Sequence, residues 1–418
     1  MHVGILGSGQ LSQMMVQASR KLKIQLRILA GSPEDSAAQE ALKTPGVEVI
    51  YGKISQPEVL AQFLSGLDRV AFESELIDIE ILRAALPKTA VTKPSKDGEG
   101  LRFVPELSVM ALLSEKLEQK KLLQQLNIPM AQFREGPAFT GDLSAWLKSL
   151  QKEWGAFVLK WSKFGYDGRG VLMVSPTDEG LKAALESATA ALFRGTRVYA
   201  EPKVKFVREL AIVAVQGPAE YKDKKKGDFR TYPLVVSEQK GGACHWVRGP
   251  AAQEGVRPDF EEKARSYALK LAQELGLQGC FAIEMFETAE GELLVNEIAP
   301  RVHNTGHYTQ EACNHDQFEM HLRAVLGQKL PELKCEVSFA MLNLLGPDDV
   351  KGRFVGVGDK LPHPPQDLAL HWYSKDDVFP GRKLGHVNAS AKSHAELQKK
   401  ISELKEYEIN WTKFLKGL

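Results

Sequence analysis

The most informative stretch of the chain covers residues 160–170 and reads KWSKFGYDGRG. Lys160 ends an apolar segment, and the loop after it holds three glycines together with charged side chains of both signs. Glycines let a backbone approach a ligand closely, and lysine and arginine side chains neutralise oxyanions. An ordinary hairpin turn would account for one of these glycines and not for the others. The stretch therefore predicts a flap that closes over phosphate groups.

Two apolar segments further along, residues 281–286 and 293–298, are separated by a short turn and predict a pair of antiparallel strands. Each segment carries one carboxylate at an otherwise apolar position, Glu284 and Glu297. A buried carboxylate is costly unless it is paired, so a cation is its natural partner. Together with Asn296 these side chains form an all-oxygen ligand set that suits Mg²⁺, with substrate phosphates completing the coordination. A surface-facing pair of strands is the alternative.

Two polar loops predict anion sites. Residues 301–309, RVHNTGHYT, follow the second of these strands directly, so the arginine, the amide and the two histidines of this loop could bind a second, small anion beside the metal. A zinc site at His303 and His307 is disfavoured, because no cysteine or further histidine completes a closed set. Residues 380–386, PGRKLGH, form a compact basic turn that suits a phosphomonoester, although a plain surface turn would explain it equally well.

The N-terminal part of the chain alternates apolar strands with helical segments. Residues 1–6 predict a strand, which leads through a glycine turn at residues 7–9 into a helix. Further strands are predicted at residues 24–29, 47–51 and 69–72, so a parallel, doubly wound sheet is expected. The glycine turn suits a phosphate or a carboxylate. Dinucleotide binding is disfavoured, because Ser12 replaces the third glycine of that motif.

The remainder predicts an α+β unit and a small β-rich terminal module. We expect a linker at residues 92–105, before a helix, and a solvated hairpin loop at the lysine-rich residues 222–227. The other expected strands are residues 157–160, 171–174, 198–202, 209–215, 338–345 and 368–373, and the expected helices are residues 114–126 and 259–275. Glu73 follows a strand of the first sheet at its carboxyl edge, where it could hydrogen-bond an amine or a hydroxyl.

Composition excludes several classes of protein. The chain has 418 residues, which is enough for two or three domains, and its formal net charge of +1 provides no global field to hold a nucleic acid or an anionic membrane. No apolar run reaches the roughly 18–20 residues of a bilayer span, and the start carries no signal-peptide pattern. We expect a cytoplasmic protein. The four cysteines lie far apart in the sequence, which disfavours a disulfide framework.

Taken together, these motifs resemble the ATP-grasp superfamily and, within it, the family of 5-(carboxyamino)imidazole ribonucleotide synthases, the ATPase subunit of phosphoribosylaminoimidazole carboxylase. The most specific pieces are GYDGRG (165–170), NEIAPRVHNTGHYTQ (296–310), QFEMHLRA (317–324) and PGRKLGH (380–386). The resemblance implies an α/β and α+β ATP-grasp fold. It would consist of an N-terminal Rossmann-like pre-ATP-grasp domain (1–105), an ATP-grasp domain (106–335, with a mobile lid at about 130–205) and a small C-terminal β-rich domain (336–418).

The resemblance also implies an activity. ATP, bicarbonate and 5-aminoimidazole ribonucleotide would give the N-carboxylated ribonucleotide, ADP and phosphate through carboxyphosphate, with Mg²⁺ or Mn²⁺, in purine biosynthesis. The implied assembly is a homodimer that passes its product to a mutase and contacts neither nucleic acid nor membrane. Two alternatives stay open: a formate-dependent glycinamide ribonucleotide transformylase, and a non-catalytic nucleotide-binding paralogue. The second is kept open by Ser12, Gln13 and Gln239, which depart from the usual family pattern.

Individual site residues follow from the resemblance. It implies that the nucleotide contacts Lys116, Lys120, Lys160, Gly165, Tyr166, Asp167, Gly168, Arg169, Gly170, Glu201, Pro202, Lys203, Val204, Glu209, Gln239 and Asn296. It implies that the ribonucleotide contacts Gln10, Leu11, Glu73, Tyr166, Arg169, Arg382 and Lys383. It assigns Mg²⁺ to Glu284 and Glu297 and the catalytic roles to Asp167, Arg169, His303 and Asn304. The base near the reacting amine would be Asp167 or His303.

Overall fold

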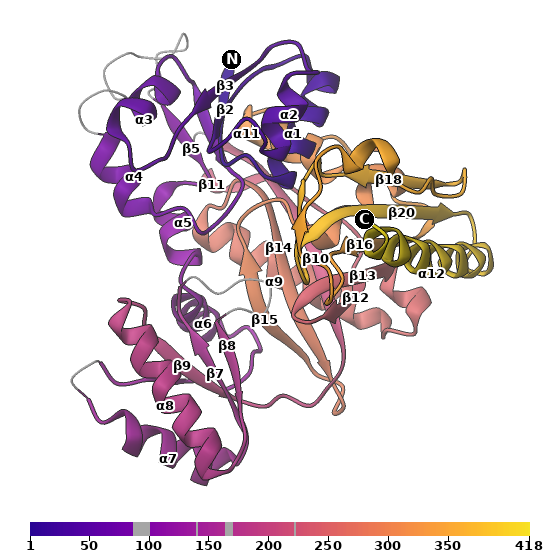
Figure 1. Cartoon of the computed structure of the whole chain (residues 1–418). Helices are drawn as coiled ribbons and strands as arrows, with labels where there is room; N and C mark the ends of the chain where they lie inside the picture. The colour runs from indigo at the N-terminus through magenta and orange to yellow at the C-terminus, as the bar shows by residue number, and fades with distance from the viewer. Residues whose placement is uncertain (87–100, 139–140, 164–169, 221–222) are drawn as a thin grey trace.

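The computed structural model describes residues 1–86, 101–138, 141–163, 170–220 and 223–418. Figure 1 shows an N-terminal α/β unit, a smaller unit built on β7, β8 and β9, and a long central sheet that runs on into the C-terminal part of the chain. This is the ATP-grasp arrangement that the sequence predicts. Within the described residues, no helix is long and apolar enough to cross a membrane.

The N-terminal unit is a five-stranded parallel sheet with the strand order β3-β2-β1-β4-β5. Its strands are β1 (His2–Leu6), β2 (Gln25–Ala30), β3 (Val47–Tyr51), β4 (Arg69–Phe72) and β5 (Arg102–Val104). Its helices are α1 (Gln10–Leu22), α2 (Ser36–Ala41), α3 (Pro57–Leu64) and α4 (Ile79–Ala85). The first four strands confirm the prediction.

The fifth strand corrects the predicted linker at residues 92–105. Residues 102–104 instead pair with β4, with Phe103 opposite Val70, and Val104 is buried in the core. The strand was missed because it is three residues long and flanked by glycine and proline. Two helices follow it, α5 (Leu107–Leu113) and α6 (Lys116–Gln125), where the sequence predicts one helix over 114–126.

The smaller unit covers residues 134–202, within the predicted lid at about 130–205, and we refer to it as the lid. Its sheet has the order β6-β9-β7-β8, and two helices lie on it. The elements are β6 (Arg134–Glu135), α7 (Leu143–Trp154), β7 (Phe157–Trp161), β8 (Val171–Val174), α8 (Asp178–Phe193) and β9 (Val198–Pro202). Leu147, Phe157, Leu159 and Ala188 belong to a hydrophobic core of its own. The lid is therefore a self-contained packing unit joined to the rest of the chain.

The central sheet has nine strands and the order β15-β14-β10-β12-β13-β16-β20-β18, with β11 paired to β10. Its strands are β10 (Phe206–Glu220), β11 (Asp223–Thr231), β12 (Val235–Lys240), β13 (Ala243–Gly249), β14 (Gly279–Thr288), β15 (Leu293–Ala299), β16 (Ser338–Leu345), β18 (Leu368–Trp372) and β20 (Lys383–Ala391). The predicted antiparallel pair is confirmed as β14 and β15. The predicted loop at 222–227 is wrong for residues 223–227, which belong to β11.

The C-terminal module extends this sheet rather than forming one of its own, because β16 pairs with both β13 and β20. A two-stranded ribbon, β17 (Gly352–Arg353) and β19 (Asp377–Val378), lies beside it. The module ends in α12 (His394–Lys416), a 23-residue helix that the sequence analysis does not predict. Leu397, Ile401, Leu404, Tyr407 and Trp411 recur every three or four residues on its buried face.

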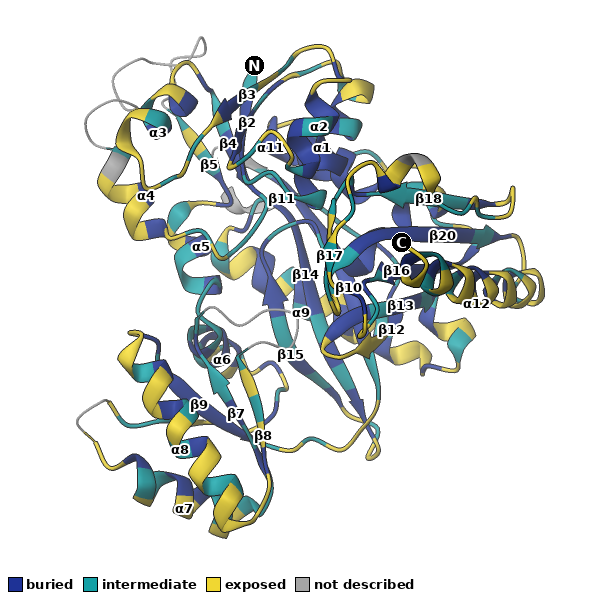
Figure 2. Cartoon of the chain, viewed as in Figure 1, coloured by how far each residue is buried: buried dark blue, intermediate teal, exposed yellow. Residues whose placement is uncertain are grey.

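The remaining helices connect the layers. They are α9 (Pro258–Leu275), α10 (Thr309–Ala312) and α11 (Gln317–Val325), with short 3₁₀ turns η2 (Ala251–Glu254), η3 (Asn304–Gly306) and η4 (Val357–Lys360). Helix α11 packs against α1 of the N-terminal unit and against β10 and β14 of the central sheet. Figure 2 shows the central strands buried along much of their length, whereas α7, α8 and α12 expose one face. Helix α11 therefore lies between the N-terminal unit and the central sheet.

Candidate active site

The two predicted metal carboxylates lie opposite each other. Glu284 on β14 and Glu297 on β15 are direct partners in the antiparallel register, so their side chains share one face of the sheet. Burial and the neighbouring Glu297 carboxylate raise the pKa of Glu284 to about 7. Lys116, the first residue of α6, places its Nζ 2.8 Å from Glu297 Oε2. Burial alone would lower the pKa of the Lys116 ammonium, but Glu297 outweighs it and the pKa is raised.

Two further lysines converge on a single carboxylate. The Nζ atoms of Lys120 and Lys160 each lie 2.6 Å from an oxygen of Glu201, and Lys160 also donates to Asn296 Oδ1 at 3.3 Å. Burial would raise the pKa of Glu201, but the two ammonium groups hold it at about 2. One carboxylate against two ammonium groups leaves one positive charge in excess. A phosphate group is a suitable partner for that charge.

The nucleotide side of the site continues along β9 and β10. Pro202 ends β9, and Lys203 and Val204 follow it in the connection to β10. Glu209, on β10, forms a hydrogen bond with Gln239, and burial raises the pKa of its carboxyl group. The structure thus brings together Gln239 and Glu209, both of which the resemblance assigns to the nucleotide. Glu201, another residue of that set, contacts Lys120 and Lys160 through its side chain.

The loop after β15 holds a neutral histidine. His303 Nδ1 lies 2.8 Å from Thr305 Oγ1 and accepts from the Thr305 N–H at 3.4 Å, which favours the tautomer with the proton on Nε2. His303 Nε2 lies 3.5 Å from Glu284 Oε1. Burial, Arg301 and Lys383 lower the pKa of His303 to about 3. At neutral pH this ring is therefore a hydrogen-bond donor toward the carboxylate pair.

Asn304 is held by a second amide. Its Nδ2 donates to Asn343 Oδ1 at 3.1 Å, while Asn343 Nδ2 donates to Asn304 Oδ1 at 2.6 Å and to the Cys244 carbonyl at 3.0 Å. Both asparagines are buried. The side chain that the sequence places beside the small anion is thus fixed by β16.

A buried ion pair that the sequence analysis does not assign joins the N-terminal unit to this loop. Arg301 makes a two-point contact with Glu75, which follows β4, and its Nη2 lies 2.8 Å from Glu75 Oε1. Burial would raise the pKa of Glu75, but Arg301 holds it at about 2. The only sequence signal was the position of Glu75, two residues after Glu73 at the carboxyl edge of the sheet.

The glycine turn after β1 binds a carboxylate, and that carboxylate belongs to the chain itself. Glu73 Oε2 accepts from the Gly9 N–H at 2.7 Å, and its Oε1 accepts from the Leu11 N–H at 3.1 Å. A Cβ at Gly9 would lie 2.5 Å from Glu73 Oε1, so this glycine makes the contact possible. The turn thus binds a carboxylate, one of the two anions that the sequence predicts there, and the chain itself supplies it.

The predicted ribonucleotide residues are only partly brought together. Lys375, which the sequence analysis does not assign, donates to Gln10 Oε1 at 2.8 Å and to the Lys383 carbonyl at 2.9 Å. Lys383 lies close enough to the carboxylate pair and the histidine loop to influence the pKa values of Glu284 and His303. Arg382 donates instead to the Asp377 carbonyl at 2.9 Å. Arg382, which precedes β20, and Lys383, the first residue of β20, therefore have different neighbours.

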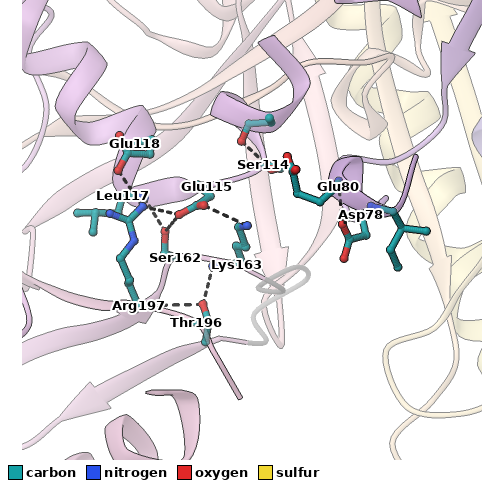
Figure 3. A network of polar contacts seen from close by, with 12 residues as sticks. Asp78, Glu80, Ser114, Glu115, Leu117, Glu118, Ser162, Lys163, Thr196 and Arg197 are labelled. Carbon is teal, nitrogen blue, oxygen red and sulfur yellow. Dashed lines mark hydrogen bonds and ion pairs between the residues drawn. The ribbon is translucent and has the colours of Figure 1, made fainter. Parts of the chain in front are cut away.

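The lid is connected to α6 by an ion-pair network drawn in Figure 3. Arg197 Nη2 contacts both Glu115 and Glu118, and Lys163 Nζ lies 3.1 Å from Glu115 Oε1. The Ser162 carbonyl accepts from the backbone N–H of Lys116 at 2.8 Å. This network joins the lid segment just before the flap to the start of the helix that carries Lys116.

Most of the flap lies outside the described residues. Gly165, Tyr166, Asp167, Gly168 and Arg169 are among those not described, and only Gly170 of the GYDGRG motif is placed, at the start of β8 with φ +83°. Within the described part of the chain, no group of three or more His, Cys, Asp or Glu side chains is arranged to hold a metal ion.

Comparison with known proteins decides the family. Three family models match the chain: the ribonucleotide synthetase preATP-grasp domain at residues 1–97, the ATP-grasp domain at 121–318, and the phosphoribosylaminoimidazole carboxylase C-terminal domain at 340–400. The N5-carboxyaminoimidazole ribonucleotide synthase of Synechococcus elongatus is 31% identical over 98% of this chain and 95% of its own length. The chain belongs to the N5-carboxyaminoimidazole ribonucleotide synthase family.

Other members of this synthase family agree. The synthase of Mycobacterium leprae is 34% identical over 92% of this chain and 83% of its own length. The crystal structure of the Aspergillus clavatus synthase in complex with ADP and 5-aminoimidazole ribonucleotide has a TM-score of 0.79 and 28% identity, with 98% of each chain covered. As a member of this family the chain is an ATP-dependent ligase, and the transformylase alternative is not favoured.

Proposed function

We propose that the chain carboxylates 5-aminoimidazole ribonucleotide with bicarbonate and ATP, giving N5-carboxyaminoimidazole ribonucleotide, ADP and phosphate. The observation that carries this proposal is the convergence of three groups on one face of the central sheet. These groups are the carboxylate pair Glu284 and Glu297, the lysines around Glu201, and the His303 loop. The ATP and ribonucleotide named for the Aspergillus structures would occupy this place.

The carboxylate pair fits Mg²⁺. Burial and the facing Glu297 carboxylate raise the pKa of Glu284, and a divalent cation would remove the repulsion between the two carboxylates. Mg²⁺ is usually held by one or two carboxylates together with substrate phosphates. When bound, the metal would neutralise negative charge on the phosphates. Mn²⁺, which accepts the same oxygen ligands, would substitute for it.

The chain's own residues would then act in sequence. Lys120 and Lys160 would neutralise charge on the nucleotide phosphates while a bicarbonate oxygen attacks the γ-phosphorus in line, which gives ADP and carboxyphosphate. His303 would donate its Nε2–H to the small anion that sits beside the carboxylate pair. Asn304, fixed by Asn343, would face the same anion through its remaining amide hydrogen.

Carbon transfer would follow under the flap. Carboxyphosphate breaks its C–O bond and releases phosphate, and the exocyclic amine of the ribonucleotide attacks the carbon and loses a proton. Because His303 carries its proton on Nε2, Asp167 is the better candidate for the base that takes this proton. Exclusion of water decides whether the activated carbon reaches the amine or is wasted as free bicarbonate.

The ribonucleotide would lie at the carboxyl edge of the N-terminal sheet. Lys375 donates to Gln10 Oε1 and to the Lys383 carbonyl, and these contacts support adding Lys375 to the phosphate-binding set with Lys383. Glu73 would contribute by holding the glycine turn at residues 7–9 in place through its hydrogen bonds. A homodimer, a cytoplasmic location and transfer of the product to a mutase complete the proposal and rest on the family resemblance alone.

Steady-state phosphate release tests the proposal. The purified chain with Mg-ATP should release phosphate at a rate that requires both bicarbonate and 5-aminoimidazole ribonucleotide, with close to one phosphate for each ribonucleotide carboxylated. Release that requires formate and glycinamide ribonucleotide would reassign the chain to the transformylases. Nucleotide binding without turnover under any of these conditions would indicate a non-catalytic paralogue.

A further inference from the structure

One buried glutamine joins the helix of the nucleotide lysines to the strand of the metal carboxylate. Gln119 lies on α6, between Lys116 and Lys120, and is buried. Its Oε1 accepts from the Ile298 N–H at 2.9 Å, and its Nε2 donates to the Ile298 carbonyl at 2.8 Å. The other Nε2 hydrogen bonds the Leu113 carbonyl at 2.6 Å. The amide thus takes the place of a neighbouring strand along β15, next to Glu297.

A second buried glutamine makes the same contact with the anion loop. Gln317 is the first residue of α11, in the QFEMHLRA motif, and is fully buried. Its Oε1 accepts from the His303 N–H at 2.8 Å, and its Nε2 donates to the His303 carbonyl at 2.7 Å. Nε2 also lies 3.3 Å from His307 Nδ1. A Cβ at Gly306 would lie 2.8 Å from the Gln317 amide carbon, so the loop is closed tightly over this side chain.

We propose that Gln119 and Gln317 are positioning residues, each of which fixes a different half of the active site. Gln119 fixes β15 against α6, and so sets Glu297 against Lys116 and Lys120. Gln317 fixes the backbone of His303, and so sets the imidazole that faces the small anion. This inference rests on the proposed function, because it takes Glu297 as a metal ligand and His303 as an anion contact.

The chemistry of the two amides explains why glutamine is needed. Each uses its oxygen and both amide hydrogens on partners that are themselves inside the protein. A buried polar network whose members are all paired holds a single arrangement, whereas a half-paired one is costly. A glutamate at either position keeps the acceptor for the backbone N–H. When ionised it cannot donate to the backbone carbonyl, and when protonated it has one donor where the amide has two, so at least one of the hydrogen bonds made by the amide is lost.

Two matched variants test the assignment. In Gln119→Glu, the Michaelis constant for Mg-ATP should rise about tenfold or more, while that for bicarbonate changes little. In Gln317→Glu, the constant for bicarbonate should rise by a similar factor, about tenfold, with that for Mg-ATP nearly unchanged. Phosphate released per ribonucleotide carboxylated should exceed unity only in Gln317→Glu, since a misplaced loop lets the activated carbon escape.

A third variant controls for the substitution itself. Gln278 Nε2 donates to the Ala324 carbonyl at 2.5 Å, and Ala324 is not one of the proposed site residues. Gln278→Glu should leave both Michaelis constants unchanged. If a glutamate variant at 119 or 317 lacks a cooperative thermal transition, the uncharged Gln→Met variant replaces it, and the same split is required. A position at which neither variant folds is structural, and its assignment is overturned.

The outcomes separate this inference from the proposed function. If Gln119→Glu and Gln317→Glu change all the constants by a common factor, both glutamines are merely structural and the inference is wrong. The proposed function survives that result as long as the wild-type chain couples bicarbonate to ATP cleavage. If the wild-type chain shows no such coupling, the proposed function itself fails, whatever the variants do.

Discussion

Replacing Glu75 by glutamine should destabilise the fold by an amount that depends on pH. The ion pair with Arg301 is largely buried, with side-chain exposures of 17% for Arg301 and 14% for Glu75. Burial opposes ionisation, but Arg301 lowers the pKa of Glu75 from 4.5 to about 2. A shift of this size corresponds to about 3 kcal/mol of stability, comparable to the cost of leaving one member of a buried pair alone.

The sign of the pH dependence follows from the direction of that shift. Because the pKa of Glu75 is lower in the folded chain than in the unfolded one, the stabilisation is fully present above 4.5 and disappears as the pH falls toward 2. Urea unfolding of wild type and Glu75→Gln should differ by about 3 kcal/mol at pH 7, with the gap closing in acid. Glu80→Gln is the control, because its pair with Arg83 is exposed. Equal effects of the two variants would refute the reasoning.

Three further perturbations test other contacts. Burial lowers the pKa of His321 to about 4, so the free energy of unfolding of wild type should fall by about 3 kcal/mol between pH 6.5 and 4. The free energy of unfolding of His321→Gln, measured by urea unfolding over the same pH range, should fall by less. Glu115→Gln removes one of the carboxylates that hold Arg197, and differential scanning calorimetry should show the lid transition weakened by about 1 kcal/mol, with unchanged calorimetry counting against the network. Lys383→Met should raise the Michaelis constant for the ribonucleotide more than Arg382→Met does, and the reverse order would place Arg382 on the phosphate.

Much of the fold was predictable because it depends on local patterning. Residues 171–174, 198–202 and 338–345 are apolar segments bounded by polar or turn residues, and their predicted bounds match those of β8, β9 and β16. The carboxylate pair was predictable for the same reason: a charge within an apolar strand is conspicuous, and the short turn fixes which positions face each other. The sequence analysis does not predict strand β5, which is only three residues long. It also does not predict the long helix α12, although the buried residues of that helix form an apolar stripe.

The site contacts that the sequence did not predict join residues that are far apart along the chain. Glu75 and Arg301 are 226 residues apart, and Gln119 and Ile298 are 179 apart. No periodicity in one segment can indicate which side chain of another will meet it, since that depends on how the three units pack. Glu73 illustrates the same limit, because the sequence indicated an anion at the glycine turn correctly but could not say that the chain itself supplies it.

The most direct test of the central claim follows oxygen from bicarbonate. If bicarbonate attacks the γ-phosphorus and the resulting carboxyphosphate breaks its C–O bond, one bicarbonate oxygen stays on the phosphate that is released. The wild-type chain supplied with oxygen-18 bicarbonate, Mg-ATP and 5-aminoimidazole ribonucleotide should therefore release phosphate that carries one heavy oxygen, read by mass spectrometry early in the reaction. Unlabelled phosphate, which takes its new oxygen from water, would show that ATP is merely hydrolysed and would contradict the account.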